Sequence, residues 1–228
     1  MVSDRPELPD GATRLVIFDC DGILVDTENM ANERLALWLT EAGYPVDFNY
    51  CRKHFSGRSM ISVRNEILEV AGIDLGEDFA DRWNIGLPEL FAKGVDEIPY
   101  VRGVIDAVRV ADIPYCVASS ARVSKMHITL GVTGLLPFFE HAMFSSTMVG
   151  RSKPFPDLFL HAAREMGVEP ADCIVIEDSV AGTKAGIAAG MRVFSYNGDP
   201  HSDPEGLERA GGILFADMRD LPGLIPLR

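Results

Sequence analysis

The sequence has no excess of positive charge and no long apolar run. Its 21 lysine and arginine residues are outnumbered by 34 aspartate and glutamate residues, so the formal net charge is −13. An acidic chain without a lysine- or arginine-rich run has no electrostatic attraction to nucleic acid or to an anionic membrane. No apolar stretch reaches the roughly 18 residues that a transmembrane helix requires. These absences exclude nucleic acid and membranes as expected partners.

Cysteine and histidine are scarce, and neither shows the spacing of a metal site. The cysteines Cys20, Cys51, Cys116 and Cys173 are far apart, and three of them lie in apolar runs, so we expect reduced thiols rather than disulfides. The five histidines also lack metal-ligand spacing. The N-terminus is acidic and has neither the basic start nor the apolar core of a signal peptide. We therefore expect a cytoplasmic protein.

Short apolar runs alternate with helical patterns over much of the chain, in which 47% of the 228 residues are hydrophobic. Uninterrupted apolar runs are typical of parallel strands that helices cover on both faces. The clearest runs are Leu15–Phe18, Tyr115–Ala118 and Cys173–Ile176, and weaker ones are His141–Phe144, Met191–Ser195 and Gly212–Phe215. The alternation predicts an α/β fold with a doubly wound, mostly parallel sheet.

Helical spacing is clear in two segments between these runs. Val123, Met126, His127 and Leu130 recur at the spacing of one helix face, and Gly131 is a stop signal. This pattern predicts that His127 lies in the core. A second helix is expected over 158–166, with Gly167 closing it.

Residues 29–94 contain helical patterns and no strand pattern. The four stripes are Leu35–Ala42, Phe48–Phe55 with Asp47 as N-cap, Met60–Ala71, and Phe79–Leu90 with a bend at Pro88. Such an insertion would start at the carboxyl end of the first strand, where α/β sheets bind ligands. We predict a core domain of residues 14–28 and 95–228, a helical domain of residues 29–94, and a disordered segment of residues 1–13.

Two carboxylates follow the first apolar run, in the segment Phe18-Asp19-Cys20-Asp21-Gly22. Asp19 and Asp21 are two residues apart at a strand end, so their side chains point to the same side. Like charges so close together need a cation or a shared proton. The alternative is a turn in which aspartate acts as a cap. A calcium loop is excluded because Leu24 and Val25 stand where it would need oxygen ligands.

Three more polar groups follow strands or precede helices. Ser119 and Ser120 come before a helix start, where a hydroxyl and free N–H groups can bind an anion, although serine is also a common N-cap. Lys153 precedes a helix and can neutralise acidic groups, or it is a solvated loop residue. Glu177 and Asp178 offer oxygen ligands suited to Mg²⁺, and the following helix is so poor in large side chains that its backbone must pack closely.

Taken together and in this order, these four segments resemble the four motifs of the haloacid dehalogenase superfamily. The resemblance extends from Leu15 to about Phe215. The runs 19–28 and 177–182 are similar to the β-phosphoglucomutase-like branch of small sugar-phosphate phosphatases. In that branch a helical cap lies between the first two motifs, and residues 29–94 occupy this position. The resemblance implies a Rossmann-like core with an inserted all-helical cap.

The resemblance also implies a Mg²⁺-dependent phosphatase that acts on a small phosphorylated metabolite. Asp19 would take the phosphoryl group as an aspartyl phosphate, and Asp21 would act as general acid and base. Mg²⁺ would be held by Asp19, by the Asp21 backbone carbonyl, by Asp178, and by Glu177 either directly or through water. The implied phosphate or substrate ligands are Ser119, Ser120, Lys153 and Arg122, together with Lys53, Gly57 and Arg58 of the cap loop.

Three alternatives are weighed on particular residues. Dehalogenases lack the second aspartate of the first motif, so Asp21 argues against that activity. β-Phosphoglucomutases carry a cap histidine and a cap arginine at positions that fall on Ala31 and Met60, and both departures argue against a mutase. Arg58, two residues before Met60, could replace the arginine, so the mutase is kept as the second hypothesis. A non-catalytic phospho-acceptor module would lack Asp21 and residues 29–94. The exact substrate and the oligomeric state stay open.

Overall fold

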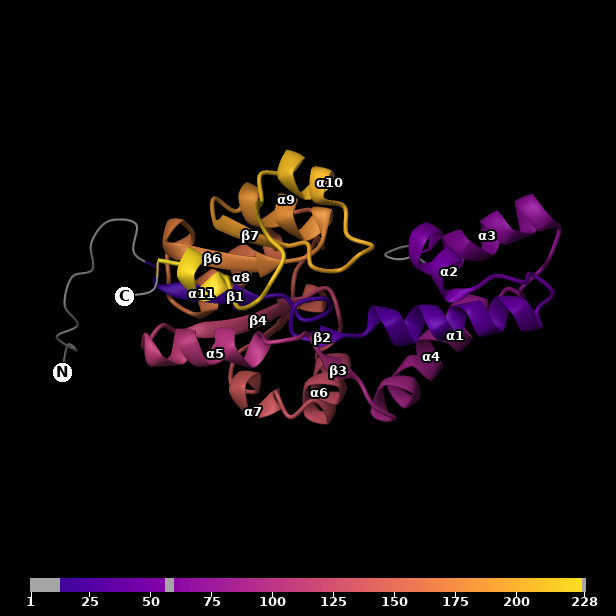
Figure 1. Ribbon diagram of the computed structural model, residues 1–228, viewed down its shortest axis with the longest axis horizontal. Helices are drawn as coiled ribbons and strands as arrows, with labels where there is room; N and C mark the ends of the chain where they lie inside the picture. Colours follow the sequence, from indigo (N-terminus) through magenta and orange to yellow (C-terminus); the bar gives the residue numbers. More distant parts are fainter. Residues whose placement is uncertain (1–12, 56–59, 227–228) are drawn as a thin grey trace. The chain divides into compact units, whose positions relative to one another are not determined.

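Six parallel strands form one sheet at the centre of the first of two structural units (Figure 1). The computed structural model describes residues 13–55 and 60–226. The strands are β1 Leu15–Phe18, β4 Tyr115–Ser119, β5 Met143–Ser145, β6 Cys173–Glu177, β7 Arg192–Tyr196 and β8 Ile213–Phe215. Their order is β5-β4-β1-β6-β7-β8, and each lies in or beside an apolar run identified above. The prediction of an α/β fold with a parallel sheet is confirmed.

The central strands of the sheet are buried on both faces because helices cover them. The helices of this unit include α5 Val101–Val110, α8 Asp157–Glu165, α9 Val180–Ala188, α10 Pro204–Arg209 and α11 Leu221–Leu224. Leu15 and Ile17 of β1 share one hydrophobic cluster with Phe159 of α8 and Ala185 of α9. On β1 the side chain of Phe18 contacts the ring of Phe139 edge-on instead. All four β1 residues are fully buried, which explains their uninterrupted apolar sequence.

The second unit is mainly helical and has its own core. Its helices include α1 Glu28–Glu41, α2 Phe48–His54, α3 Met60–Ala71 and α4 Phe79–Ala92. Leu39, Cys51, Ile67 and Phe79 belong to one buried cluster. Asp47 caps α2, because its side chain accepts a hydrogen bond of 2.8 Å from the Tyr50 N–H. The predicted N-cap is therefore confirmed.

The boundaries of the two units differ from those expected. The second unit comprises Leu24–Ile98 and Ser124–Pro137, and the described parts of Met1–Ile23, Pro99–Val123 and Phe138–Arg228 form the first. A short ribbon accounts for one difference, because β2 Val25–Asp26 pairs antiparallel with β3 Asp96–Glu97. The other is the segment that holds most of α6 Val123–Val132 and the start of α7 Leu136–Phe139. Of the N-terminal segment, residues 1–12 lie outside the described residues, and Thr13 is buried.

Two features of the helices were not anticipated. The expectation for His127 is wrong: it is exposed, and Thr129 of the same helix is buried instead. Helix α5 was not identified, although Val101, Val104, Ile105 and Val108 form a regular buried stripe. None of the helices between residues 13 and 226, residues 56–59 aside, has both the length and the apolar character to cross a membrane.

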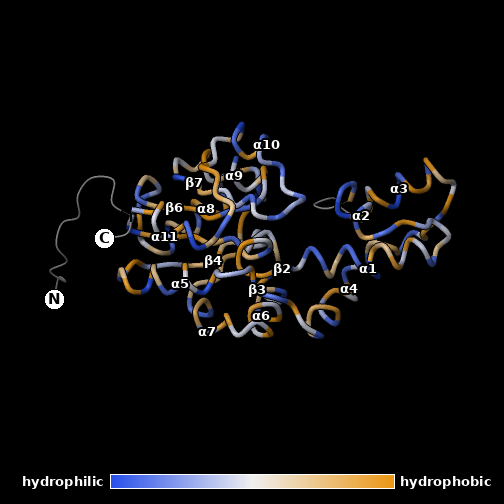
Figure 2. Tube along the Cα trace, viewed as in Figure 1, coloured by the Kyte–Doolittle hydropathy of each residue, from blue (hydrophilic) through white to orange (hydrophobic). Residues whose placement is uncertain are grey.

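Hydropathy along the chain follows the layers of the fold. The central strands are mainly hydrophobic, whereas the helices alternate between hydrophilic and hydrophobic residues (Figure 2).

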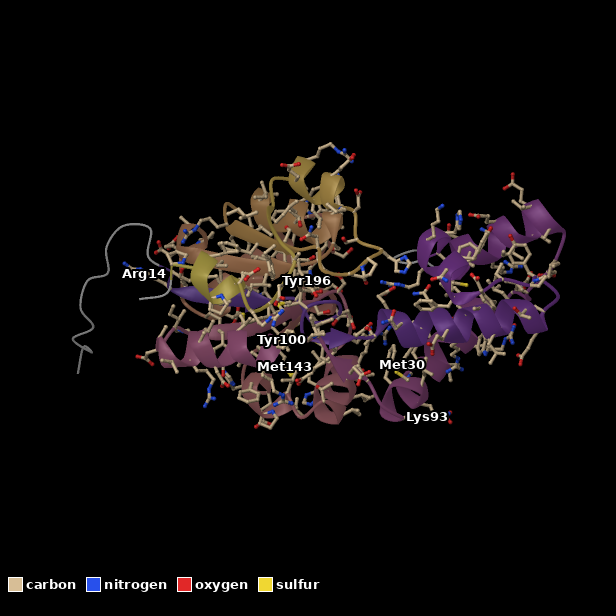
Figure 3. All side chains as sticks on the ribbon, in the orientation of Figure 1. Arg14, Met30, Lys93, Tyr100, Met143 and Tyr196 are labelled. Carbon is tan, nitrogen blue, oxygen red and sulfur yellow. The ribbon has the colours of Figure 1, made fainter. Side chains whose placement is uncertain are left out.

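Tyr100, labelled in Figure 3, precedes α5 with a left-handed backbone at φ 67°. Its exposed ring lies 4.3 Å from the Arg219 guanidinium carbon, so the C-terminal segment packs against this turn.

Candidate active site

The carboxyl ends of three neighbouring strands bring three polar side chains to one edge of the sheet. Asp19 follows β1, Ser119 ends β4 and Glu177 ends β6. Strand β1 lies between the other two, and all three run in the same direction. The Asp19 N–H donates a hydrogen bond of 2.9 Å to the Ile176 carbonyl, which fixes the backbone after β1. All three side chains are buried, so the sheet holds polar groups where water is excluded.

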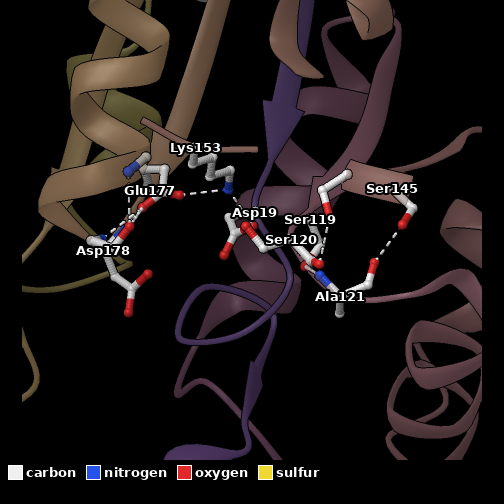
Figure 4. A network of polar contacts seen from close by, with 11 residues as sticks. Asp19, Ser119, Ser120, Ala121, Ser145, Lys153, Glu177 and Asp178 are labelled. Atoms are coloured by element: carbon white, nitrogen blue, oxygen red, sulfur yellow. Dashed lines mark hydrogen bonds and ion pairs between the residues drawn. The ribbon is translucent and has the colours of Figure 1, made fainter. Parts of the chain in front are cut away.

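Lys153 joins two of these strand ends (Figure 4). Its ammonium Nζ lies 2.7 Å from Asp19 Oδ1 and 2.6 Å from Glu177 Oε1, and the side chain is 5% exposed. Burial by itself lowers the pKa of Lys153, but the two carboxylates outweigh it and raise the pKa above its ordinary value. The ammonium therefore stays charged. Lys153 is a buried member of the site and not a solvated loop residue.

The buried environment of Asp19 gives its carboxyl group an unusually high pKa. Burial raises the pKa of Asp19 to about 7, and the negative charges of Glu177 and Asp21 act in the same direction. The Lys153 ammonium opposes this shift but does not cancel it. A further cation beside Asp19 would favour its charged form, which is the form that can act as a nucleophile.

Glu177 has both carboxylate oxygens occupied. Oε1 accepts from Lys153, and Oε2 accepts from the Asp178 N–H at 2.8 Å, the Ser179 N–H at 2.6 Å and the Ser179 hydroxyl at 2.9 Å. Ser179 also caps α9, since its Oγ accepts from the Gly182 N–H at 3.0 Å. A Cβ on Gly182 would overlap the Glu177 carboxylate. The glycine is therefore required for the carboxylate to turn back over the start of α9.

The rest of α9 packs closely, as its small residues predict. A Cβ on Gly186 would lie 2.5 Å from a methyl carbon of Val193 on β7. The helix backbone therefore rests against the sheet at this point, and the expectation of close packing is confirmed.

Asp19, Glu177 and Asp178 form an acidic cluster that could hold a metal ion. One carboxylate oxygen from each lies within 4.8 Å of the others. Asp178 is half-buried, and a Cβ on Gly22, whose φ is +81°, would overlap its carboxylate. The turn after Asp21 thus passes close to Asp178. Clustered carboxylate oxygens are the ligands that Mg²⁺ prefers, so the residues present fit this ion.

The loop after β4 is held by hydroxyl groups. Ser119 Oγ accepts from the Ala121 N–H at 3.1 Å, and Ser145 Oγ donates to the Ala121 carbonyl at 2.7 Å (Figure 4). Ser146 Oγ donates to the Ser120 carbonyl at 2.8 Å. The end of β5 therefore supports the backbone that follows Ser119. Ser145, Ser146 and Ser179 were not among the predicted site residues, although Ser179 belongs to the run Glu177-Asp178-Ser179 that follows a strand and precedes a helix.

Four of the other residues that the resemblance implies lie in the described part of the chain, and two do not. Asp21 is half-buried next to the cluster in sequence, and Ser120 and Arg122 are exposed before α6. Lys53 is exposed near the end of α2. Gly57 and Arg58 lie outside the described residues. For Arg122 and these three cap residues a role in binding stays a prediction.

Comparisons with known proteins identify relatives that cover most of the chain. The 6-phosphogluconate phosphatase of Escherichia coli (strain K12) is 33% identical over 210 residues, which cover 92% of this chain and 93% of that protein. A haloacid dehalogenase family hydrolase from Deinococcus radiodurans R1, solved with bound phosphate and sodium, shares 28% identity and a TM-score of 0.83. It covers 96% of this chain and 100% of its own.

A candidate β-phosphoglucomutase from Thermotoga maritima is also similar. Its structure gives a TM-score of 0.77 at 25% identity, with 93% of this chain and 98% of that chain covered. The model of the haloacid dehalogenase-like hydrolases matches residues 16–196, a range that includes all of the strand-end residues described above. The resemblance read from the sequence is thereby confirmed, and the chain belongs to the haloacid dehalogenase-like hydrolase family.

Proposed function

We propose that this hydrolase is a Mg²⁺-dependent phosphatase that releases phosphate from a small sugar phosphate through an aspartyl phosphate on Asp19. The observation that carries the proposal is the buried arrangement of Asp19, Lys153 and Glu177, with distances of 2.7 and 2.6 Å from the ammonium to the two carboxylates. A carboxylate is a weak nucleophile, so it needs fixed geometry and nearby positive charge. Lys153 supplies both to Asp19.

The reaction divides into two displacements at phosphorus. An Asp19 oxygen attacks the phosphorus, the bond to the ester oxygen breaks, and Asp21 donates its proton to the leaving alkoxide. A water molecule then gives a proton to the Asp21 carboxylate and attacks the same phosphorus. The bond to Asp19 breaks, which releases inorganic phosphate and the free carboxylate.

Positive charge is the main requirement of this site, because the chain as a whole carries −13. Mg²⁺ held by Asp19, Asp178 and the Asp21 carbonyl would supply charge that neutralises the phosphate oxygens. Both Glu177 oxygens already accept hydrogen bonds, from Lys153 and from donors of residues 178 and 179. Glu177 would therefore act on the metal through neighbouring residues or through a bridging water. Ser119 and Lys153 bind the remaining phosphate oxygens.

The substrate class follows from the relatives. The similar protein from Escherichia coli is named as a 6-phosphogluconate phosphatase, and another relative from that bacterium as hexitol phosphatase A. Both names describe phosphatases of small metabolites. This supports a small sugar phosphate, or a related phosphorylated metabolite, as substrate of the present chain.

The second hypothesis, a phosphomutase, is less well supported. A mutase must keep water away from its phosphoenzyme until the sugar phosphate has turned around, and it needs cap groups that grip a second phosphate. The positions that would do this are Ala31 and Met60. Both line a cavity of about 160 Å³ within the second unit, and neither can donate a hydrogen bond from its side chain. This composition favours hydrolysis.

The proposal is tested by phosphate release from a panel of metabolite phosphates with Mg²⁺. Wild type should release phosphate from at least one sugar phosphate, and Asp19→Asn should release none, because no other group can form the aspartyl phosphate. Asp106→Asn, an exposed aspartate on α5, is the matched control and should behave as wild type. Normal phosphate release by Asp19→Asn would refute the assignment of the nucleophile.

A further inference from the structure

Strand β5 lies beside β4 in the first unit, and its last residue is a buried serine. Ser145 pairs with Ser119 in the register of these two parallel strands. The Ser145 side chain is fully buried although it ends in a hydroxyl. A buried hydroxyl costs free energy unless its hydrogen bonds are made inside the protein. The hydrogen bonds of Ser145 therefore indicate its role.

Ser145 uses its whole hydrogen-bonding capacity on the backbone and side chains around it. Its Oγ donates to the Ala121 carbonyl at 2.7 Å, because a carbonyl can only accept. A hydroxyl has one proton, so in the 2.9 Å contact between the Ser145 and Thr147 hydroxyls the threonine donates. Ser145 Oγ also accepts from the Thr147 N–H at 3.2 Å. With its proton and both lone pairs used, Ser145 has no hydrogen bond left for a substrate, and its role is to hold the backbone after β4.

The next residue holds the preceding carbonyl of the same loop. Ser146 Oγ donates to the Ser120 carbonyl at 2.8 Å. A trans peptide unit is planar, and its carbonyl and N–H point in opposite directions. Fixing the Ser120 carbonyl therefore also fixes the Ala121 N–H, which donates to Ser119 Oγ at 3.1 Å. The contacts thus run from Ser146 through one peptide unit to the Ser119 hydroxyl.

The Ser119 hydroxyl keeps its proton for another partner. Its Oγ accepts from the Ala121 N–H, and among the described residues no acceptor takes the hydroxyl proton. Strand β4 is a neighbour of β1, with Val117 opposite Phe18, so Asp19 and Ser119 leave the sheet within one residue of each other. The Ser119 side chain is buried there. A fixed hydroxyl at this place is suited to donate to an oxygen of the phosphoryl group that Asp19 would receive.

We propose that Ser145 and Ser146 are positioning residues of the phosphatase reaction, which fix the direction of the Ser119 hydroxyl without touching the substrate (Figure 4). The inference rests on the proposed function, in which Ser119 binds a phosphate oxygen. A donor that is already in place costs no reorganisation when charge develops in the transition state. Without the two serines, the peptide units of residues 120–122 can rotate, and the Ser119 hydroxyl must be ordered again in each turnover. We therefore expect an effect on kcat rather than on KM.

A double-mutant cycle separates positioning from a general loss of stability. Ser119→Ala removes the donor and should lower kcat by about a hundredfold to a thousandfold. Ser145→Ala should lower kcat by about tenfold and change KM by less than about threefold, measured with Mg²⁺ and a sugar phosphate that wild type hydrolyses. In the Ser119→Ala background, Ser145→Ala should change kcat by less than about twofold, because no donor is left to position.

Two further variants are controls for the loss of a hydroxyl. Ser195 is a fully buried serine on β7 of the same unit, and its hydroxyl contacts the Thr183 hydroxyl at 2.9 Å. Ser195→Ala should lower stability in urea unfolding as Ser145→Ala does, yet keep kcat within about twofold of wild type. Ser146→Ala should lower kcat by about threefold to tenfold, whereas Ser146→Thr keeps the hydroxyl and should restore kcat to within about twofold of wild type.

The outcomes distinguish failure of this inference from failure of the proposed function. If Ser145→Ala lowers kcat by the same factor with and without the Ser119 hydroxyl, or if Ser195→Ala lowers kcat as much, positioning of Ser119 is overturned. Should Ser145→Ala not fold, the same cycle with Ser146→Ala decides the question, because Ser146 is only half-buried. If wild type releases no phosphate from any metabolite phosphate, the proposed function itself fails, and this inference with it.

Discussion

Replacing Gly182 with alanine would have two opposing effects. Alanine favours a helix more than glycine does, but its methyl group would disturb the packing around Glu177. Gly182 lies in the first turn of α9, where a Cβ would occupy the position of the Glu177 carboxylate. The Glu177 side chain is 1% exposed and is bound to Lys153 and to donors of residues 178 and 179. Room for the new methyl group can be made only by moving this carboxylate away from its partners.

The two effects differ enough in size to predict the sign of the change in the free energy of unfolding. Alanine stabilises a helix over glycine by about 1 kcal/mol. Breaking a buried ion pair while one partner stays buried costs about 3–5 kcal/mol. We therefore expect the free energy of unfolding to fall by about 2–4 kcal/mol in Gly182→Ala. Phosphate release should fall at least about tenfold, because Lys153 loses one of the two carboxylates that position it.

Urea unfolding followed by far-ultraviolet circular dichroism measures the change in stability. The matched control is Gly103→Ala in α5, where the same substitution meets nothing within 4 Å. The control should gain up to about 1 kcal/mol of unfolding free energy. A Gly182→Ala protein as stable and as active as the Gly103→Ala protein would refute the described packing of Glu177.

Further predictions concern the reaction itself. Asp21→Asn should slow turnover by about 10²–10⁴ with little change in KM, because a positioned acid–base group contributes that much; near-full turnover would remove Asp21 from that role. Removal of divalent cations by EDTA should abolish phosphate release, and Mg²⁺ should restore it; full activity in EDTA would contradict the metal assignment. With β-glucose 1-phosphate and a trace of the 1,6-bisphosphate, free phosphate should exceed glucose 6-phosphate, since Ala31 and Met60 cannot grip a second phosphate. The reverse product ratio would favour the mutase.

Much of the fold was determined by patterns that are local in the sequence. Uninterrupted apolar runs such as Leu15–Phe18 identify strands because a parallel sheet buries both faces. Stop signals and caps, among them Asp47 and Gly167, identify helix ends because the backbone groups there need special partners or geometry. Gly131 is an exception, because α6 continues to Val132. The polar residues at strand ends were also found in this way, since a strand end is visible in the sequence.

Some of the interpretation required the tertiary structure. His127 shares the spacing of the apolar stripe of α6, yet it is exposed, because spacing predicts a helix face but not which edge of that face is covered. The ribbon of β2 and β3 pairs residues about seventy positions apart, and each strand has two residues, too few for a periodic pattern.

The arrangement of the candidate site was decided by the tertiary structure alone. Lys153 reaches Asp19 across 134 positions of sequence and Glu177 across 24, and in sequence it is one lysine before a proline. From the sequence Glu177 could bind Mg²⁺ either directly or through water, and only the folded structure shows that its oxygens are bound to Lys153 and to donors of residues 178 and 179. The sequence determines which chemical groups stand at each strand end, because that depends on neighbouring residues. Which of these groups then form hydrogen bonds or ion pairs with one another depends on strand order, because only the folded sheet brings the strand ends together.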